Sequence, residues 1–186
     1  MTLWDWLLSI STLPVEFRSN DLITGLPVIF RRMEITDLEE VLALDRLSFS
    51  LPWPESSFKF EIESNPVSRC WVAEVNQAGT PVIAGMIVIW LIVDEAHVAT
   101  FAVHPDYRRM KIGQKLLAFT LKDAYHAGAV RSFLEVRSGN QAARNLYTRF
   151  SYREVGVRRH YYKDNGEDAI MMNLEEIDLA KLESLQ

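Results

Sequence analysis

Hydrophobic residues along the chain occur in two kinds of pattern, and each predicts one kind of element. Runs rich in β-branched and aromatic residues predict strands at 28–33, 68–76, 82–93, 97–103, 130–138, 152–162 and 169–176. Apolar positions three and four apart predict helices at 35–49, about 112–126, 139–150 and from 177 onwards. Thr36 and Glu39 have capping-box spacing at the first helix. Pro54 favours the start of a second short helix, and Gly128 the end of the helix before it.

The order of these elements predicts a single domain of the α/β or α+β class. They follow one another as β-α-α-β-β-β-α-β-α-β-β with short connections, and no repeat or Gly/Ser linker interrupts them. We therefore expect a central mixed, mostly antiparallel sheet with helices on both faces. We place this domain at 27–175, between an N-terminal extension at 1–26 and a C-terminal helical tail at 176–186.

Composition narrows the classes of function. The chain has 186 residues and a formal net charge of −5, which disfavours nucleic-acid binding over its whole surface. A single cysteine, Cys70, excludes an internal disulfide and a zinc site built on several cysteines. Its place in an alternating strand makes it a buried structural thiol. The four histidines lack the spacing of metal ligands, so we expect no metal: His97, His104, His126 and His160.

The N-terminal segment MTLWDWLLSISTLPVEF is apolar, but it contains Asp5 and lacks a basic leader. It is too short to span a bilayer. Two interpretations stay open: a weak signal peptide, or a short amphipathic helix that packs on the domain or on a partner. With no longer apolar run elsewhere, we expect a cytoplasmic protein that does not bind membranes.

The segment FAVHPDYRRMKIGQKLL, residues 101–117, is the densest candidate for an anion site. A strand ends at Val103 and a helix opens near Ile112, so the backbone N–H groups of 109–114 lie at a helix start. Free N–H donors and the helix dipole favour a phosphate there. Three nearby cations make the electrostatic potential at this helix start more positive: Arg108, Arg109 and Lys111. The alternative is a solvated basic helix start, and the lone Gly113 fits neither a Walker nor a Rossmann motif.

Glu135 lies in the middle of the apolar strand SFLEV. Strands that follow a helical crossover tend to be buried on both faces, and a buried carboxylate must be paired, solvated or protonated. Glu135 therefore either pairs with an arginine, Arg137 or Arg158, or faces a wet cleft as a base.

Two further segments combine polar and aromatic residues. Asn140 starts a predicted helix, and Tyr147 lies on the same face of it, where a lone tyrosine is normally a core residue. The segment RRHYY, which contains Tyr161 and Tyr162, is either a solvated edge strand with aromatic cover or the wall of a groove that holds a peptide.

In this order, VHPDYRRMKIGQKLL, LEVRSGNQAARNLYTRF and RRHYYKDNGEDAIMM resemble the GNAT acetyltransferase superfamily. Within it the chain resembles the RimI group, the ribosomal-protein alanine N-acetyltransferases, and SFSLPWPESSF resembles a loop of that group. The resemblance runs from about Val28 to Leu174. It implies the GNAT fold, with acetyl-CoA as co-substrate and no metal.

The resemblance also implies a role for each matched residue. Phe101, Ala102 and Val103 would form a splayed strand that pairs with the pantetheine arm and points an N–H at the thioester carbonyl. Coenzyme A would be held by Arg108, Arg109, Met110, Lys111, Ile112, Gly113, Gln114 and Asn140. Glu135 matches the general base and Tyr147 the general acid. Tyr161 and Tyr162 would flank the N-terminal residues of the substrate.

Lys111 departs from the family pattern R/Q-x-x-G-x-G/A, because it stands where the first glycine belongs. Gly113 fills the second glycine position. A positive φ would strain a lysine, so we expect Lys111 to have ordinary helical φ and ψ angles and an outward side chain.

The implied reaction is direct transfer of an acetyl group to a protein N-terminal α-amine, most directly the N-terminal alanine of a ribosomal protein. Glu135 would remove a proton through a water, and Tyr147 would protonate the leaving thiolate or hydrogen-bond to it. Two other classes stay open: a non-catalytic acyl-CoA-binding regulator and an acetyltransferase for a small-molecule amine. We expect a monomer or weak dimer without direct contact to nucleic acid.

Overall fold

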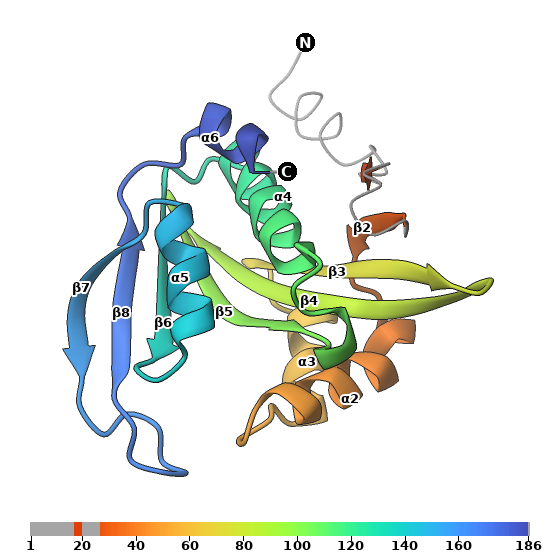
Figure 1. Cartoon of the computed structure of the whole chain (residues 1–186), viewed down its shortest axis with the longest axis horizontal. Helices are drawn as coiled ribbons and strands as arrows, with labels where there is room; N and C mark the ends of the chain where they lie inside the picture. Colours follow the sequence, from red (N-terminus) through yellow and green to blue (C-terminus); the bar gives the residue numbers. More distant parts are fainter. Residues whose placement is uncertain (1–16, 20–26, 186) are drawn as a thin grey trace.

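The computed structural model describes residues 17–19 and 27–185, and its strands form one eight-stranded sheet. The strands are β1 (Phe17–Ser19), β2 (Val28–Arg32), β3 (Ser68–Gln77), β4 (Thr80–Ile92), β5 (Glu95–Val103), β6 (Arg131–Arg137), β7 (Arg153–Arg158) and β8 (Ala169–Leu174). They lie in the order β1-β2-β3-β4-β5-β6-β8-β7 (Figure 1). Every neighbouring pair is antiparallel except β5 and β6, which confirms the predicted mixed sheet.

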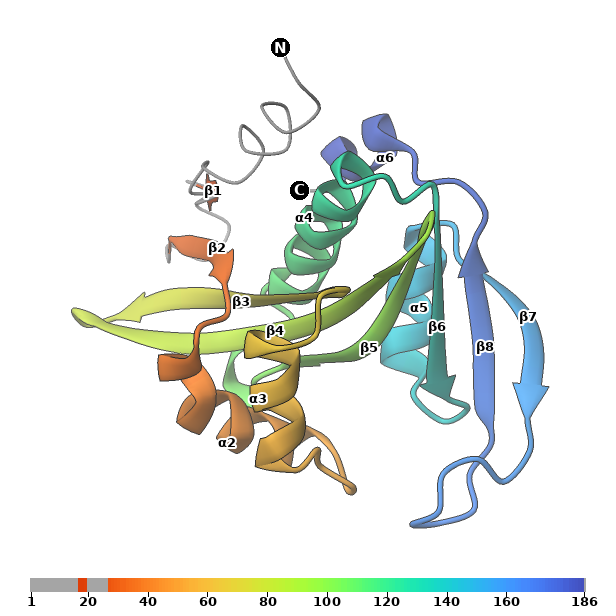
Figure 2. The ribbon, with the colours of Figure 1, turned by 180° about the vertical axis from the view of Figure 1, so that it is seen from behind.

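Helices cover both faces of the sheet, as predicted. The helices α2 (Leu38–Ser48) and α3 (Glu55–Glu63) lie on one face, and α4 (Ile112–His126) and α5 (Gln141–Arg149) lie on the other (Figures 1 and 2). Two short 3-10 turns, η1 (Ile35–Asp37) and η2 (Pro105–Tyr107), precede α2 and α4. The last helix, α6 (Leu179–Ser184), packs against the α4 side of the molecule through the buried Leu182.

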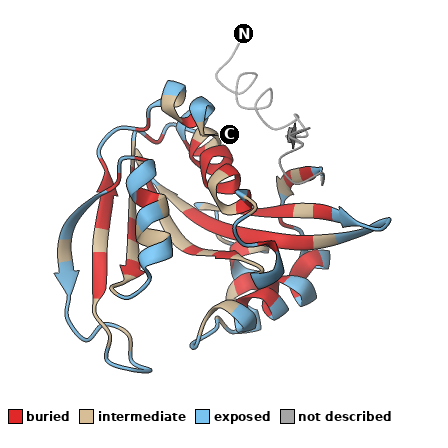
Figure 3. Ribbon diagram, in the orientation of Figure 1, coloured by how far each residue is buried: buried red, intermediate tan, exposed pale blue. Residues whose placement is uncertain are grey.

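The two helical layers enclose two hydrophobic cores, one on each side of the central strands (Figure 3). Adjacent residues of β3 show this directly, because Trp71 belongs to the core under α4 and Val72 to the core under α2. Trp71 meets Phe119 of α4 edge to face, with ring centroids 4.8 Å apart. Cys70 is buried in the second core, which confirms the prediction of a structural thiol.

The start of the first helix differs from its prediction. Thr36 and Glu39 do not form the capping box. Instead Asp37 accepts a hydrogen bond of 2.8 Å from the backbone N–H of Glu34 and two from the guanidinium of Arg31, at 2.7 and 2.8 Å. The capping box of this region therefore lies two residues earlier than predicted, with Glu34 and Asp37 in place of Thr36 and Glu39, and the chain turns at η1 before α2 begins.

The predicted strand at 152–162 is too long, because β7 ends at Arg158. Residues 159–168 connect β7 to β8 and satisfy their own backbone groups. The N–H of Tyr162 donates to the carbonyl of Glu167 at 3.0 Å, and the N–H of Gly166 donates to the carbonyl of Tyr162 at 2.8 Å. Tyr161 and Tyr162 therefore lie in a connection and not on a strand edge.

The outermost strand on this side of the sheet is β7. Its residues are mostly exposed, and a register shift in its pairing with β8 falls between Glu154 and Gly156. Val155 is the extra residue of this irregularity. Figure 3 shows the exposed strand in pale blue.

The two interpretations of the N-terminal segment concern residues 1–17, and all of these except Phe17 lie outside the described residues. The described part of that region, β1, pairs with β2 through Phe17 and Phe30. None of the helices in the described part of the chain has both the length and the hydropathy that crossing a bilayer requires.

Gly128 follows α4 with φ of +105°, as its predicted position after the helix requires. A β-carbon added there would have no neighbour within 4 Å, so backbone strain would be the main penalty. Gly128→Ala should reduce the free energy of unfolding by about 1 kcal/mol. Gly128→Asn should lose less, because asparagine adopts positive φ more readily. Urea denaturation followed by circular dichroism tests this, and equal stability of the alanine variant and wild type would contradict it.

Candidate active site

The strands β5 and β6 run side by side only over their first residues. Their pairing extends from Glu95 and Arg131 to Val98 and Leu134 and then stops. Beyond that point β5 continues along β4, and β6 continues along β8. The shift in register between β4 and β5 leaves Ala99 as an extra residue, and such a bulge bends its strand. Residues 99–103 of β5 therefore have an edge that β6 does not cover, as the splayed-strand expectation requires.

The backbone of Val103 faces this free edge. The N–H of the next residue, His104, donates to the carbonyl of Ala84 on the β4 side at 2.9 Å. Because neighbouring residues of a strand direct their N–H and C=O groups to opposite edges, those of Val103 point away from β4. The guanidinium of Arg108 confirms this direction, since its Nε donates to the carbonyl of Val103 at 3.1 Å.

The first turn of α4 packs closely on the same part of β5. A β-carbon on Gly113 would lie 3.1 Å from Cγ2 of Val103 and 3.4 Å from Cζ of Phe101. These contacts are tighter than ordinary van der Waals contacts, so a side chain at this position would require its neighbours on β5 to shift. The structure thus brings the predicted cradle at 108–114 together with the free edge of β5. Ala102 points to the opposite face and belongs to the core under α2.

The backbone of the cradle corrects one expectation. Lys111, the residue before α4, has φ of +56° and ψ of 5°, and Arg109 has φ of +66°. The expectation that Lys111 has ordinary helical angles was therefore wrong. The chain must reverse sharply between η2 and α4, and two left-handed residues achieve this. A lysine in this conformation is strained by about 1 kcal/mol relative to glycine.

Glu135 is the first residue of β6 beyond its pairing with β5. Its Oε1 forms an ion pair with Nη1 of Arg158 at 2.9 Å, and 28% of its side chain is exposed. The carboxylate is therefore both paired and accessible. The expectation that β6 is buried on both faces was wrong, because buried and partly exposed residues alternate along the strand. In the described structure the core under α2 takes its strand residues from β3, β4 and β5.

Tyr147 is buried on α5, with 6% of its surface exposed. This burial raises the pKa of its phenol, and the nearby Tyr162 raises it further. Asn140 caps the same helix, because its Oδ1 accepts a hydrogen bond of 3.1 Å from the N–H of Ala143. A contact between Asn140 and a ligand would therefore use its amide nitrogen.

Tyr161 and Tyr162 meet edge to face, with ring centroids 5.3 Å apart. The interaction of its hydroxyl group with the nearby carboxylate of Glu135 is the main cause of the raised pKa of Tyr161. Burial raises the pKa of Tyr162 to about 12, and the charge of Glu135 adds to that rise. The structure thus gathers both tyrosines around Glu135, with Tyr162 also close to Tyr147.

Three residues of this region were missed as functional candidates. Arg137 was considered only as a partner of Glu135, but it pairs instead with Asp164 and Glu167, and Asp164 also binds Ser50. The arginine two residues after Glu135 on the same face of the strand was the available signal. No comparable signal in the sequence pointed to Ser50 or Asp164. Within 17–19 and 27–185, no cluster of three or more histidine, cysteine or acidic side chains could hold a metal ion.

A family model described as Acetyltransferase (GNAT) family matches residues 38–152. The chain belongs to this family. The match contains the cradle, the splayed strand, Glu135 and Tyr147.

Similarity to individual proteins also supports the assignment of this GNAT acetyltransferase to the family. It is 33% identical to the [Ribosomal protein bS18]-alanine N-acetyltransferase of Escherichia coli K12, over 76% of this chain and 93% of that protein. The crystal structure of the ribosomal-protein-S18-alanine N-acetyltransferase from Escherichia coli has a TM-score of 0.71 and 30% identity, and covers 81% of this chain and 94% of that one. Arabidopsis thaliana NAA60 in complex with acetyl-CoA shares the fold alone, at 17% identity and a TM-score of 0.72, over 79% and 97% of the two chains.

The strain at Lys111 can be separated from its charge by two substitutions. Lys111→Gly removes both, whereas Lys111→Ala removes only the charge. We expect the glycine variant to be more stable than the alanine variant by about 1 kcal/mol in urea denaturation. Calorimetric titration with coenzyme A should give the glycine variant an affinity equal to or above that of wild type. A marked loss of affinity in both variants would show instead that the lysine charge contributes to the phosphate site.

Proposed function

We propose that this GNAT acetyltransferase acetylates the N-terminal α-amine of a protein, and that its natural acceptor is the N-terminal alanine of a ribosomal protein. The observation that carries the proposal is the grouping of Glu135, Tyr147, Tyr161 and Tyr162 beside the free edge of β5. The printed names of the Escherichia coli relatives support the choice of acceptor.

The residues present fit acetyl-CoA, which supplies an acetyl group activated as a thioester. The free edge of β5 offers backbone groups to the amides of the pantetheine arm. Close packing of Gly113 on Val103 places the start of α4 beside that edge, where its N–H groups favour a pyrophosphate. Arg108 and Arg109 complement the negative charge of the pyrophosphate.

Glu135 activates the acceptor amine. An α-amine has a pKa of about 8, so at neutral pH it arrives mostly as an ammonium ion. This ion competes with Arg158 for the carboxylate of Glu135, since both are cations. Glu135 then takes the proton, through a water, and leaves a neutral amine whose lone pair can attack.

The amine forms a C–N bond with the acetyl carbon, the C–S bond breaks as the thiolate leaves, and the second proton of the amine nitrogen passes to that thiolate to give the free thiol of coenzyme A. The N–H of Val103 faces the site and can donate to the oxyanion that forms at the carbonyl. Because burial raises the pKa of Tyr147, full proton transfer from its phenol to a thiolate is less favourable than in water. We therefore assign Tyr147 mainly the role of a hydrogen-bond donor to the leaving sulfur.

The surroundings of Glu135 suit a peptide better than a small polyamine. Tyr161 and Tyr162 offer two aromatic faces and hydroxyl groups that can hold a peptide backbone. The net charge of −5 also favours a basic acceptor such as a ribosomal protein.

Glu135→Gln should lower kcat/KM for an alanine-starting peptide at least about 100-fold, because the amide cannot accept the proton. Tyr147→Phe should reduce kcat by a smaller factor, because it removes one hydrogen-bond donor. Thiol release followed spectrophotometrically gives both rates, and titration with coenzyme A should show that both variants still bind it. Rates like that of wild type in both variants would refute the assigned roles.

The acceptor can be identified with a peptide library that varies the first residue. With acetyl-CoA and mass spectrometry, we expect acetylation at the α-amine and the highest rate for alanine. Peptides with a blocked N-terminus and an internal lysine serve as the control. Acetylation of lysine side chains alone would exclude N-terminal transfer, and binding without thiol release would indicate an acyl-CoA-binding regulator.

A further inference from the structure

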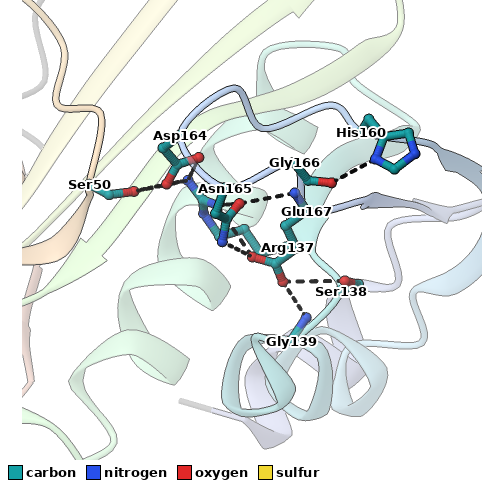
Figure 4. A network of polar contacts seen from close by, with 9 residues as sticks. All are labelled: Ser50, Arg137, Ser138, Gly139, His160, Asp164, Asn165, Gly166 and Glu167. Atoms are coloured by element: carbon teal, nitrogen blue, oxygen red, sulfur yellow. Dashed lines mark hydrogen bonds and ion pairs between the residues drawn. The ribbon is translucent and has the colours of Figure 1, made fainter.

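Arg137 lies at the centre of a polar network on the open face of β6 (Figure 4). Its Nη2 donates to both carboxylate oxygens of Asp164, at 3.0 and 2.9 Å, and to the hydroxyl of Ser50 at 3.0 Å. Its Nη1 donates to Oε2 of Glu167 at 3.3 Å. The guanidinium also covers the ring of Tyr162, 3.9 Å from its centroid. One side chain therefore contacts two loops that are distant in the sequence.

The first of these loops, residues 49–54 between α2 and α3, is itself anchored. The backbone N–H of Trp53 donates to Oδ2 of Asp45 at 2.7 Å, and Asp45 is fully buried on α2. Ser50, in the same loop, donates its hydroxyl hydrogen to Asp164. A residue held by Ser50 is therefore held in place relative to α2 and the core beneath it.

The second loop, residues 159–168, contains both Asp164 and the tyrosines beside Glu135. Its far end is fixed to the start of α5, because Oε1 of Glu167 accepts hydrogen bonds from the N–H of Gly139 at 2.6 Å and the hydroxyl of Ser138 at 3.2 Å. The middle of the loop is held to the α2–α3 loop by Arg137, Asp164 and Ser50. We name these three residues the clasp.

We infer that Arg137 is a positioning residue that holds the 159–168 loop against the α2–α3 loop, and thereby sets how tightly the acceptor peptide binds. The inference rests on the proposed function, because Tyr161 and Tyr162 are the groups whose position it controls. The carboxylate of Glu135 pairs with Arg158 and not with Arg137, so Arg137 does not take part in proton transfer. The coenzyme A cradle lies outside the clasp as well, so the clasp should affect the acceptor alone.

Energetics and geometry agree with this role. The side chains of Arg137 and Asp164 are 23% and 17% exposed, and the guanidinium pairs with the carboxylates of Asp164 and Glu167 at once. A planar guanidinium can bind a carboxylate with two nitrogens and stack on a ring at once, which an ammonium cannot. Lysine at this position should therefore restore the charge but only part of the function.

Arg137→Ala should raise the KM for the alanine-starting peptide about tenfold or more, as expected for loss of hydrogen bonds between charged groups. The kcat at saturating peptide and the affinity for coenzyme A should change much less. Arg137→Lys should recover part of the loss in KM. Arg131→Ala is the matched control, because Arg131 is an ion-paired arginine on the same face of β6 at its other end, and it should leave the KM unchanged.

Two further variants test the clasp without risk to the fold of β6. Ser50→Ala and Asp164→Ala each remove one partner from an exposed loop, and each should raise the peptide KM. Combined with Arg137→Ala, Asp164→Ala should add little, because residues that act through one contact give non-additive effects. Additive effects, or a KM like that of wild type in all the single variants, would overturn the inference.

Hydrogen exchange of the free protein provides a readout that needs no activity. In Arg137→Ala, the amides of 159–168 should exchange faster than in wild type, while those of α4 should not change. If the wild-type protein acetylated no peptide, the proposed function would fail, and the exchange result alone would decide whether the clasp exists. Unchanged exchange in 159–168 would overturn the clasp whatever the enzyme acetylates.

Discussion

Every backbone N–H and C=O in a protein interior needs a partner, and the departure of β6 from β5 after Val98 and Leu134 creates groups that the sheet does not satisfy. These groups lie in the middle of the sheet and not at its rim. The bulge at Ala99 bends β5 at this point, and the first turn of α4 closes one side of the opening. Val103 lies on the uncovered part of β5, and Glu135 is the first residue of β6 beyond the pairing.

The elements of this fold could be predicted from the sequence where local pattern determines them. The strand and helix periods and the helix end at Gly128 depend on residues near one another in the chain. Local pattern could not decide whether Arg137 or Arg158 is the ion-pair partner of Glu135. Sequence order suggests β7 as the neighbour of β6, but β8 lies between them, and Arg158 reaches Glu135 across it. That arrangement depends on tertiary structure.

The same limit explains the other differences. Lys111 has a left-handed conformation because the chain must turn from η2 into α4, and a lysine alone gives no sign of this. Asp37 pairs with Arg31 because β2 lies beside the start of α2, and the same carboxylate forms the capping box with Glu34, which local spacing alone did not indicate. The loop at 159–168 resembled a continued strand because its side chains are aromatic. Its backbone hydrogen bonds show otherwise.

The exposed strand β7 has a consequence for the behaviour of the protein in solution. Strand edges attract other strands, and the exposed Val155 and Val157 would strengthen such pairing. This edge is short, begins and ends with arginine, and is interrupted by the irregularity at Val155, all of which hinder association. Aggregation through β7 would also withdraw Arg158 from Glu135. The features that hinder edge pairing at β7 therefore also favour the ion pair between Arg158 and the candidate catalytic carboxylate of Glu135.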